Sequence, residues 1–326
     1  MYQYAIYEAH SLVGSLPSPI DDRSPTVRYL CALFAELAYY HIPQWELDDR
    51  KRAKLIPCEA YRALVAGTGG RPTSLTIDFQ KLDLPRGFAV ADRGVVAVGL
   101  VLDRLLFVGF RGTQFLFDWK VNLRSKLVPV NARFRLRPPL VFSTVSGRLH
   151  SGFAEEATRI STRVLDAIRD SNLGDVDHVF LTGHSLGGAV AAISENFVKV
   201  APTSVCILGA PRYSDLSAYI SLPDGPPTQV RRAGDVVPTV PPRAFGYADH
   251  PYEFTTSGAV YVDPAPYSST FGGLIRWCQF LAGRFQPHDM ETYRNELGTT
   301  AGAQGAMAPL APVERLTAAD VVPATA

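Results

Sequence analysis

The stretch Val179-Phe-Leu-Thr-Gly-His-Ser-Leu-Gly-Gly-Ala189 joins a short apolar run to a serine flanked by glycines and then to small residues. The run at Val179–Thr182 predicts a buried strand, and the spacing of apolar residues over Leu186–Val200 predicts a helix. Ser185 lies between them in the pattern G-x-S-x-G, which is typical of a sharp strand-to-helix turn that exposes a serine hydroxyl. Glycines suit both sides of the serine because side chains there would clash within the turn. We therefore expect Ser185 to be a nucleophile.

Strands and helices alternate on both sides of this turn. Phe153–Arg169 has the length and periodicity of a helix, and Val205–Leu208 predicts another buried strand. Upstream, Val95–Val98 and Leu105–Phe110 are rich in branched and aromatic residues and predict a hairpin. The alternation, together with the serine turn, predicts an α/β-hydrolase fold with a mostly parallel central sheet and helices on both faces.

The two ends of the chain differ in composition. Ser24-Pro25, a cap followed by proline in the first turn, begins a helix predicted over Val27–Tyr40. One catalytic domain is predicted over residues 1–297. Residues 298–326 are rich in Ala, Gly, Pro and Thr, so they are predicted to be a disordered tail that buries too little apolar surface to offset its ordering entropy.

Composition bears on nucleic-acid binding, metal and redox sites, membrane spans and location. Lys and Arg number 32 against 31 Asp and Glu, so no strong field attracts nucleic acid. The four cysteines are far apart without a C-x-x-C pair, which predicts separate thiols and neither a zinc site nor a redox motif. The most apolar segment, Gly94–Phe110, contains two charges and is shorter than the roughly 20 residues of a spanning helix, so no transmembrane segment is expected. Met1–Gly14 lacks a basic start followed by an apolar run, from which we expect a cytoplasmic location.

A serine hydroxyl becomes a good nucleophile only when a base takes its proton and a third group orients that base. In α/β-hydrolases the acid and then the histidine follow the serine along the chain. His250 and His288 are the two histidines after Ser185. This chemistry needs no cofactor and no metal, and we expect neither.

Five motifs in order resemble one known family, the fungal-type or class 3 triacylglycerol lipases, over about Val27–Leu297. The motifs are Phe110-Arg111-Gly112-Thr113, Leu149-His150-Ser151-Gly152-Phe153, Gly183-His184-Ser185-Leu186-Gly187-Gly188, Gly209-Ala210-Pro211-Arg212 and Asp235-Val236-Val237-Pro238. Five ordered motifs are more specific than any one of them.

The resemblance implies roles for particular residues. The family's acid stands in an Asp-x-Val-Pro segment after a strand, which matches Asp235 after a strand at Val230–Ala233. This aspartate could instead only cap the turn before Pro238. The family's base stands a few residues before an aromatic on a late helix, which matches His288, and His250 is then structural; the reverse assignment stays open. His150 and His184 match positions that support the fold, with ordinary packed histidines as the alternative.

The resemblance also implies how the oxyanion and the substrate would be held. The backbone amides of Leu186 and Thr113 correspond to the oxyanion hole. An apolar cluster just after Thr113 resembles the Trp-bearing lid helix of the family, with an ordinary packed helix as the alternative. Lys120 and Asn122 depart from the family pattern beside this loop, which weakens the inference about substrate. The lid residues would be Phe115, Leu116, Phe117 and Trp119.

Taken together, the sequence predicts a carboxylic ester hydrolase that cleaves acyl glycerol esters through an acyl-enzyme, with transient contact to a lipid interface. A phospholipase or a small-ester esterase with the same triad is an alternative. A catalytically silent scaffold of lipase-like fold is a third, because fold alone does not determine function.

Arg133, Arg135 and Arg137 alternate along the chain, which suggests a strand with one basic face. This face could bind an anionic headgroup or a carboxylate, or it could simply be solvated on an edge strand.

Overall fold

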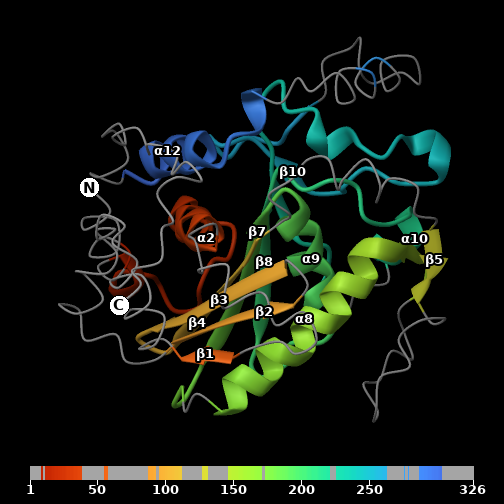
Figure 1. Ribbon diagram of the computed structural model, residues 1–326. Coiled ribbons are helices and arrows are strands. Elements are labelled where there is room, and N and C mark those ends of the chain that lie inside the picture. The colour runs from red at the N-terminus through yellow and green to blue at the C-terminus, as the bar shows by residue number, and fades with distance from the viewer. Residues whose placement is uncertain are drawn as a thin grey trace, which may run out of the picture.

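The fold is built around one twisted sheet with helices on both of its faces (Figure 1). It is known from a computed structural model. The residues that the structure describes are 9, 12–38, 55–57, 87–92, 95–111, 127–130, 146–170, 173–220, 225–262, 275, 278 and 286–302.

The main sheet has eight strands in the order β1-β2-β3-β4-β7-β8-β9-β10. Their bounds are β1 Leu55–Pro57, β2 Gly87–Asp92, β3 Val95–Leu102, β4 Leu105–Arg111, β7 His178–His184, β8 Thr203–Leu208, β9 Thr228–Val230 and β10 Glu253–Phe254. Strands β1 to β4 pair antiparallel, and β4, β7, β8, β9 and β10 pair parallel. The predicted α/β-hydrolase fold is confirmed. The predicted hairpin is β3–β4, in which Leu102 pairs with Leu105.

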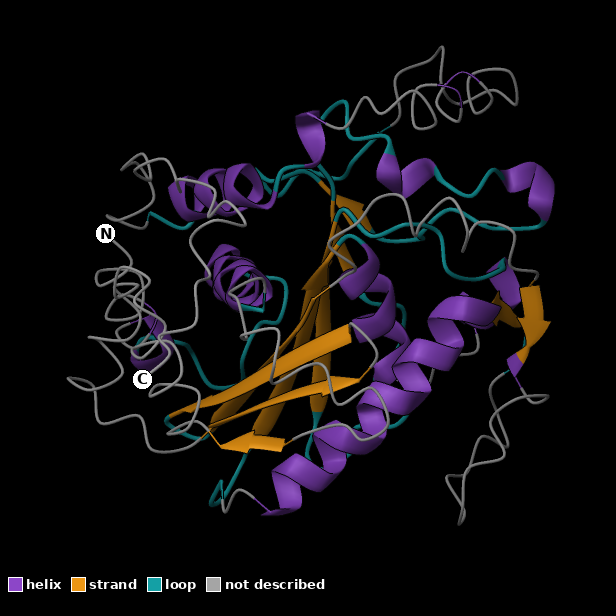
Figure 2. Ribbon diagram, in the orientation of Figure 1, coloured by secondary structure: helices purple, strands orange, loops and turns teal. Residues whose placement is uncertain are grey.

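Helices cover both faces of the sheet (Figure 2). On one face lie α8 (Ser151–Asp170) and α9 (Leu186–Ser194), and on the other lie α2 (Pro25–Leu37) and α12 (Met290–Thr300). The smaller elements are β5 Leu127–Pro129, β6 Arg148–His150, α10 Leu216–Ile220, and the 3-10 turns η1 Val237–Thr239, η2 Arg243–Phe245 and η4 Gln286–His288. Strands β5 and β6 form a separate antiparallel pair. Of the helices that the structure describes, none combines the length and apolarity needed to cross a bilayer.

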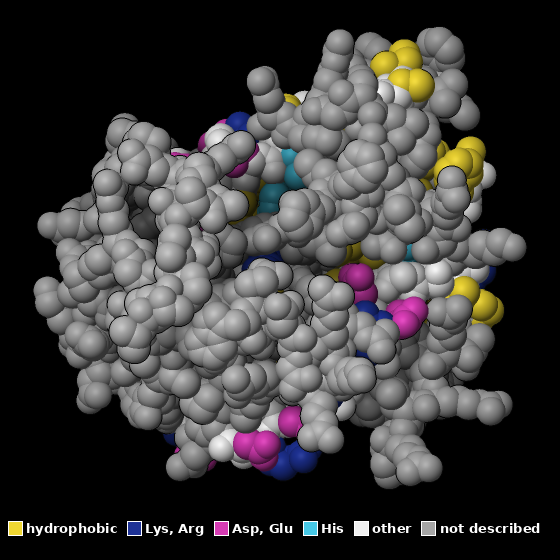
Figure 3. Space-filling model, viewed as in Figure 1, with side chains coloured by type: hydrophobic (Ala, Val, Ile, Leu, Met, Phe, Trp, Pro, Cys, Tyr) yellow, Lys and Arg dark blue, Asp and Glu magenta, His cyan; other side chains and the backbone are white. Residues whose placement is uncertain are grey.

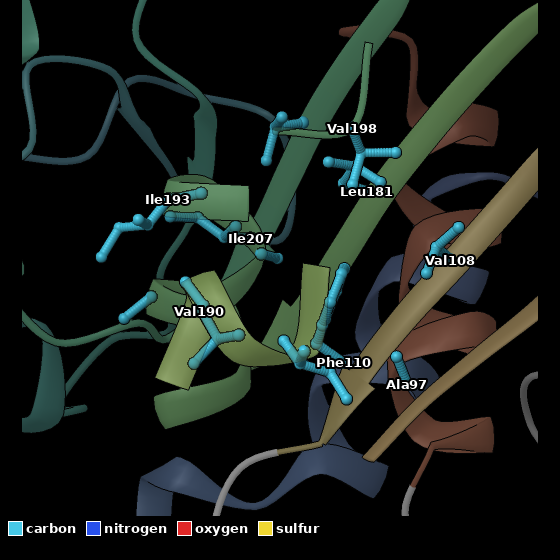
Figure 4. Packing of buried hydrophobic residues seen from close by; sticks show 14 of the residues in the cluster. Ala97, Val108, Phe110, Leu181, Val190, Ile193, Val198 and Ile207 are labelled. Carbon is cyan, nitrogen blue, oxygen red and sulfur yellow. The ribbon is translucent and has the colours of Figure 1, made fainter. Parts of the chain in front are cut away.

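Each face of the sheet carries its own apolar core. Toward α8 and α9, the side chains of Val108, Leu181 and Ile207 pack against those of Val190 and Ile193 (Figure 4). Toward α2, three rings stack in a row: the ring centroids of Phe34 and Phe107 are 4.6 Å apart, and those of Phe107 and Phe180 are 4.9 Å apart. Strands β3 and β4 are buried along their whole length. Strands buried on both faces of a sheet need nearly continuous apolar residues, which explains the composition of these two.

Helix α2 begins as its sequence predicts. The Ser24 hydroxyl accepts a hydrogen bond from the Val27 amide at 3.3 Å, and Pro25 occupies the first turn. The helix ends at Leu37, and residues 39–40 of the prediction lie outside the described residues. Of the cysteines, Cys31, Cys206 and Cys278 are free thiols, and Cys58 is also outside the described residues.

Three predicted boundaries are wrong, for local reasons. Helix α9 stops at Ser194 instead of Val200, because the Asn196 side chain bonds to the Ile193 carbonyl at 3.0 Å and the chain turns. Strand β9 ends at Val230, where Val230–Ala233 was predicted; Arg232 instead donates its amide to the Tyr293 hydroxyl. Helix α12 continues to Thr300, so the predicted tail begins inside a helix, and residues 303–326 are not described.

Gly109 of β4 provides a test of how α2 packs on the sheet. A Cβ at this position would lie 2.0 Å from the backbone oxygen of Phe34, so the helix would have to move away. We expect Gly109→Ala to lower the free energy of unfolding by about 2 kcal/mol, as overpacking does. Gly14→Ala is the matched control, because nothing lies within 4 Å of its added Cβ. Urea titration measures both; equal stability of the two variants would contradict this packing.

Candidate active site

Ser185 stands in the sharp turn between β7 and α9. Its backbone has φ 60° and ψ −131°, a left-handed conformation that costs free energy in a residue other than glycine. Its amide donates to the Leu208 carbonyl at 2.9 Å. A Cβ on Gly183 would lie 2.4 Å from the carbonyl carbon of Gly187, and one on Gly188 would lie 2.8 Å from the Cβ of Ala210. The turn therefore requires the small residues of the motif.

The candidate site lies at the carboxyl ends of the parallel strands. Ser185 follows β7, Gly209 follows β8, and Asp235 follows the turn after β9. Open α/β sheets bind their ligands at this edge. Gly209 has φ +54°, and a Cβ there would lie 2.8 Å from both the Asp235 carboxylate and the Tyr293 hydroxyl. The Gly-Ala-Pro-Arg motif thus leaves room for the acid.

Asp235 and His288 are brought together from positions far apart in the chain. Nδ1 of His288 donates to Oδ2 of Asp235 at 2.8 Å, and both side chains are buried. The Val237 amide donates to Oδ1 at 2.9 Å, so Asp235 also caps the turn η1. The same carboxylate thus caps a turn and binds His288. Among the described residues, Nε2 of His288 is buried without a hydrogen-bond partner.

Tyr293 is a third neighbour of the acid. Its hydroxyl donates to Oδ2 of Asp235 at 2.6 Å and accepts from the Arg232 amide at 3.0 Å. Burial, and next the negative charge of Asp235, raise the pKa of Tyr293 well above its ordinary value, so the hydroxyl keeps its proton. The sequence indicated an aromatic residue after the base, but its bond to Asp235 carried no sequence signal.

His184 lies against the His288 ring. The ring centroids are 4.4 Å apart with an interplanar angle of 30°. Burial, and next the charge of His288, hold the pKa of His184 well below its usual range. The ring is therefore neutral, and it supports one face of His288 from the residue next to Ser185.

The other two histidines of interest lie in packed surroundings. His250 is buried, its Nδ1 accepts from the Tyr252 amide at 3.2 Å, and its ring lies edge-on to Tyr219. Burial lowers the pKa of His250 to about 3. His150 stacks on Phe153 at 3.9 Å between ring centroids. The geometry thus joins His288, and not His250, to Asp235.

Two other carboxylates after Ser185 form ion pairs elsewhere. Asp215 accepts from Nε of Arg148 at 2.9 Å, and Asp249 pairs with Arg212 and Arg243. Asp224 and Asp263 lie outside the described residues.

Several predicted site residues also lie outside the described residues: Thr113, Phe115, Leu116, Phe117, Trp119, Lys120, Asn122, Arg133, Arg135 and Arg137. Leu186, the other predicted oxyanion residue, is the first residue of α9 and is buried. The first amides of a helix have no partner within the helix, so this amide can face a developing negative charge. Histidine side chains reach the surface in Figure 3 near the place where Figure 1 has the start of α9.

Metal binding needs a cluster of ligating side chains. The described part of the chain contains no group of three or more His, Cys, Asp or Glu residues placed to hold an ion.

A family model described as lipase (class 3) matches residues 107–245. Over this segment the chain is similar to the class 3 lipases. The matched segment includes Ser185 and Asp235 and ends before His288. The resemblance stated from the motifs is therefore confirmed, and His288 is placed beside Asp235 by the coordinates.

Three relatives show how far the similarity extends. Phospholipase A1-II 1 of Oryza sativa subsp. indica is 27% identical over 62% of this chain and 52% of its own length. Phospholipase A1-II 3 of the same rice is 29% identical over 67% and 53%. Secreted mono- and diacylglycerol lipase 1 of Fusarium solani is 28% identical over 34% of each chain. The chain spans about half the length of the rice relatives it matches.

The expected cytoplasmic location is wrong. The Fusarium solani relative is named as a secreted protein, which conflicts with that expectation. The inference from Met1–Gly14 fails because a secretory leader is removed from a mature chain, so its absence from a given stretch carries no information about location.

His250 generates a prediction for acid stability. Its pKa is about 3 in the folded chain and about 6.5 when unfolded, so below pH 6.5 the unfolded chain binds more protons. The stabilisation by the neutral ring is complete above pH 6.5 and decreases as the pH falls towards 3. Between pH 7 and pH 5 the parent should lose about 2 kcal/mol through this group, and His250→Gln should not.

Urea unfolding at the two pH values measures the difference, and Gln keeps an acceptor for the Tyr252 amide. An equal loss in parent and variant would contradict a neutral, buried His250.

Proposed function

We propose that this protein is a serine ester hydrolase in which Ser185 is the nucleophile, His288 the general base and Asp235 the orienting acid. One observation carries the proposal: the His288–Asp235 hydrogen bond of 2.8 Å lies at the strand edge where Ser185 stands in a strained turn. A buried carboxylate bound to Nδ1 fixes the tautomer of the imidazole, which leaves Nε2 to accept a proton. The single catalytic domain predicted over residues 1–297 is proposed to extend to the end of α12 at Thr300, and the tail predicted over 298–326 would begin after that helix.

Acyl transfer would occur in two steps. His288 takes the proton of the Ser185 hydroxyl as its oxygen attacks the ester carbonyl, and Asp235 stabilises the imidazolium that forms. His288 then gives the proton to the leaving alcohol, which departs and leaves an acyl-serine. In the second step His288 takes a proton from water as the water oxygen bonds to the acyl carbon. The bond between that carbon and the Ser185 oxygen then breaks, the acid product leaves, and His288 returns the proton to the Ser185 oxygen.

Negative charge develops on the carbonyl oxygen in each step. The Leu186 amide at the start of α9 is one proposed donor, and the positive end of the helix dipole adds to it. Thr113 is proposed as the second donor on the strength of the Phe-Arg-Gly-Thr motif that directly follows β4.

The proposed substrates are acyl glycerol esters. The named relatives act, by their names, on mono- and diacylglycerols or as phospholipases A1, and both groups of substrates are carboxylic esters of glycerol. A phospholipid substrate is the second candidate, favoured by the two rice relatives that match about two thirds of this chain. Phe115, Leu116, Phe117 and Trp119 remain the proposed residues for contact with a lipid interface.

A substrate panel separates these candidates. We expect fatty acid release from emulsified glycerides, with the rate rising as tributyrin passes its solubility limit. Release from phosphatidylcholine vesicles at a higher kcat/KM would instead favour the phospholipid. Turnover of soluble p-nitrophenyl esters alone would indicate an esterase.

Ser185→Ala tests the nucleophile. Because the covalent route is lost, kcat should fall about 10³-fold or more, while the melting temperature should not fall, since the strained turn keeps its backbone. An organophosphonate should label Ser185 in the parent and leave the variant unlabelled. Ser194→Ala is a matched control, because this buried serine lies at the other end of the same helix. A folded parent that neither labels nor turns over any ester of the panel would favour the silent scaffold.

A further inference from the structure

Arg232 links the segment that carries the acid to the segment that carries the base. It lies in the turn between β9 and Asp235, and its Nη1 donates to the backbone carbonyl of Pro287 at 2.7 Å. Pro287 directly precedes His288 in the turn η4. The guanidinium therefore holds the backbone next to the base from a residue three positions before the acid.

Glu296 of α12 holds the other side of the guanidinium. Nε and Nη2 of Arg232 both donate to Oε1 of Glu296, at 3.0 and 2.7 Å. Oε2 of Glu296 accepts from the Thr256 hydroxyl at 2.7 Å. Each of these contacts is to a residue more than 20 positions away in the chain, so Arg232 and Glu296 connect three separate segments.

The charged groups of this link are suited to a fixed geometry. The Arg232 side chain is 17% exposed, so solvent screens its contacts less than those of a surface pair. Burial raises the pKa of Glu296, but hydrogen bonds from Arg232 and Thr256 and the charge of Arg232 together lower it below its usual value. Glu296 is therefore ionised at neutral pH. A planar guanidinium has donors in a rigid fork, which a lysine lacks.

The backbone of Arg232 reaches the acid by a second route. Its amide donates to the Tyr293 hydroxyl at 3.0 Å, and that hydroxyl donates to Asp235 at 2.6 Å. The Arg232 Cζ also lies 5.8 Å from the centre of the Tyr293 ring. One residue thus contacts both the carbonyl beside the base and the hydroxyl that binds the acid.

We propose that Arg232, held by Glu296, is a positioning residue that sets the placement of His288 against Asp235. The effect on turnover rests on the proposed function, but the placement itself does not. A shift of about 1 Å in a catalytic group can cost on the order of 100-fold in rate, so loss of this link should be visible in kcat. Arg232 contacts Pro287, Glu296 and Tyr293 and is not one of the residues proposed to contact substrate, so KM should change little.

The test compares Arg232→Ala, Arg232→Lys and Glu296→Gln with Arg159→Ala. Arg159 is a suitable control because it is 25% exposed, is paired with Asp92 and Glu155, and lies on α8 on the opposite face of the sheet. Two readouts are used. One is the low-field NMR signal of the proton that His288 Nδ1 donates to Asp235, assigned by its absence in His288→Gln. The other is kcat per Ser185 titrated with an organophosphonate, which removes the effect of unfolded molecules.

We expect Arg232→Ala to shift or broaden the low-field signal and to lower kcat per titrated site about 10- to 100-fold, with KM within about twofold of the parent. Arg232→Lys should be intermediate, since one ammonium cannot reproduce the fork. Glu296→Gln should lower kcat in the parent but add little in the Arg232→Ala background, because both act through one link. Arg159→Ala should change neither readout.

An unchanged low-field signal and unchanged kcat per site in Arg232→Ala, with a lower melting temperature only, would overturn the proposal. If that variant does not fold, the same result in both Arg232→Lys and Glu296→Gln overturns it. If the parent shows the low-field signal but neither labels nor turns over esters, the proposed function fails, and the NMR comparison alone still decides the placement.

Discussion

A buried carboxylate is the constraint around which this edge of the structure is arranged. Asp235 is 1% exposed, and a charge out of water needs hydrogen-bond donors in place of its hydration shell. Three donors are present: His288, Tyr293 and the Val237 amide. They come from the turn η4, from α12 and from the chain just after the acid. The turn after β8 has glycine at position 209, because a Cβ there would clash with the Asp235 carboxylate and the Tyr293 hydroxyl.

Two buried histidines of this part of the fold carry no charge. His184 touches the His288 ring and His250 lies farther along the chain, and burial keeps both of them neutral at ordinary pH. The neighbouring arginines bind backbone carbonyls and other carboxylates instead of the Asp235 carboxylate: Arg232 binds Pro287 and Glu296, and Arg231 binds Glu253.

The sequence predicts the parts of this arrangement that depend on local pattern. The serine turn follows from the strand, the glycines and the small residues of one continuous stretch, and the mostly parallel sheet follows from alternating strands and helices. The pairing of His288 with Asp235 was available only through resemblance, because 53 residues separate the two and no local pattern relates them. The bonds made by Tyr293 and Arg232 could not be foreseen, since they depend on how α12 docks. Helix and strand ends were misjudged where one side chain, such as that of Asn196, bonds to the backbone.

Helix α12 packs on α2, where Arg294 pairs with the buried Glu36. The residue assigned as base therefore stands at the start of an element that docks on the N-terminal part of the fold. During synthesis, the strained turn and the acid leave the ribosome well before His288 does, because chains emerge from the N-terminal end. A nascent chain would then carry the serine and the aspartate without their proton carrier. Any hydrolytic capacity of this protein would arise late, at the moment when α12 closes against α2.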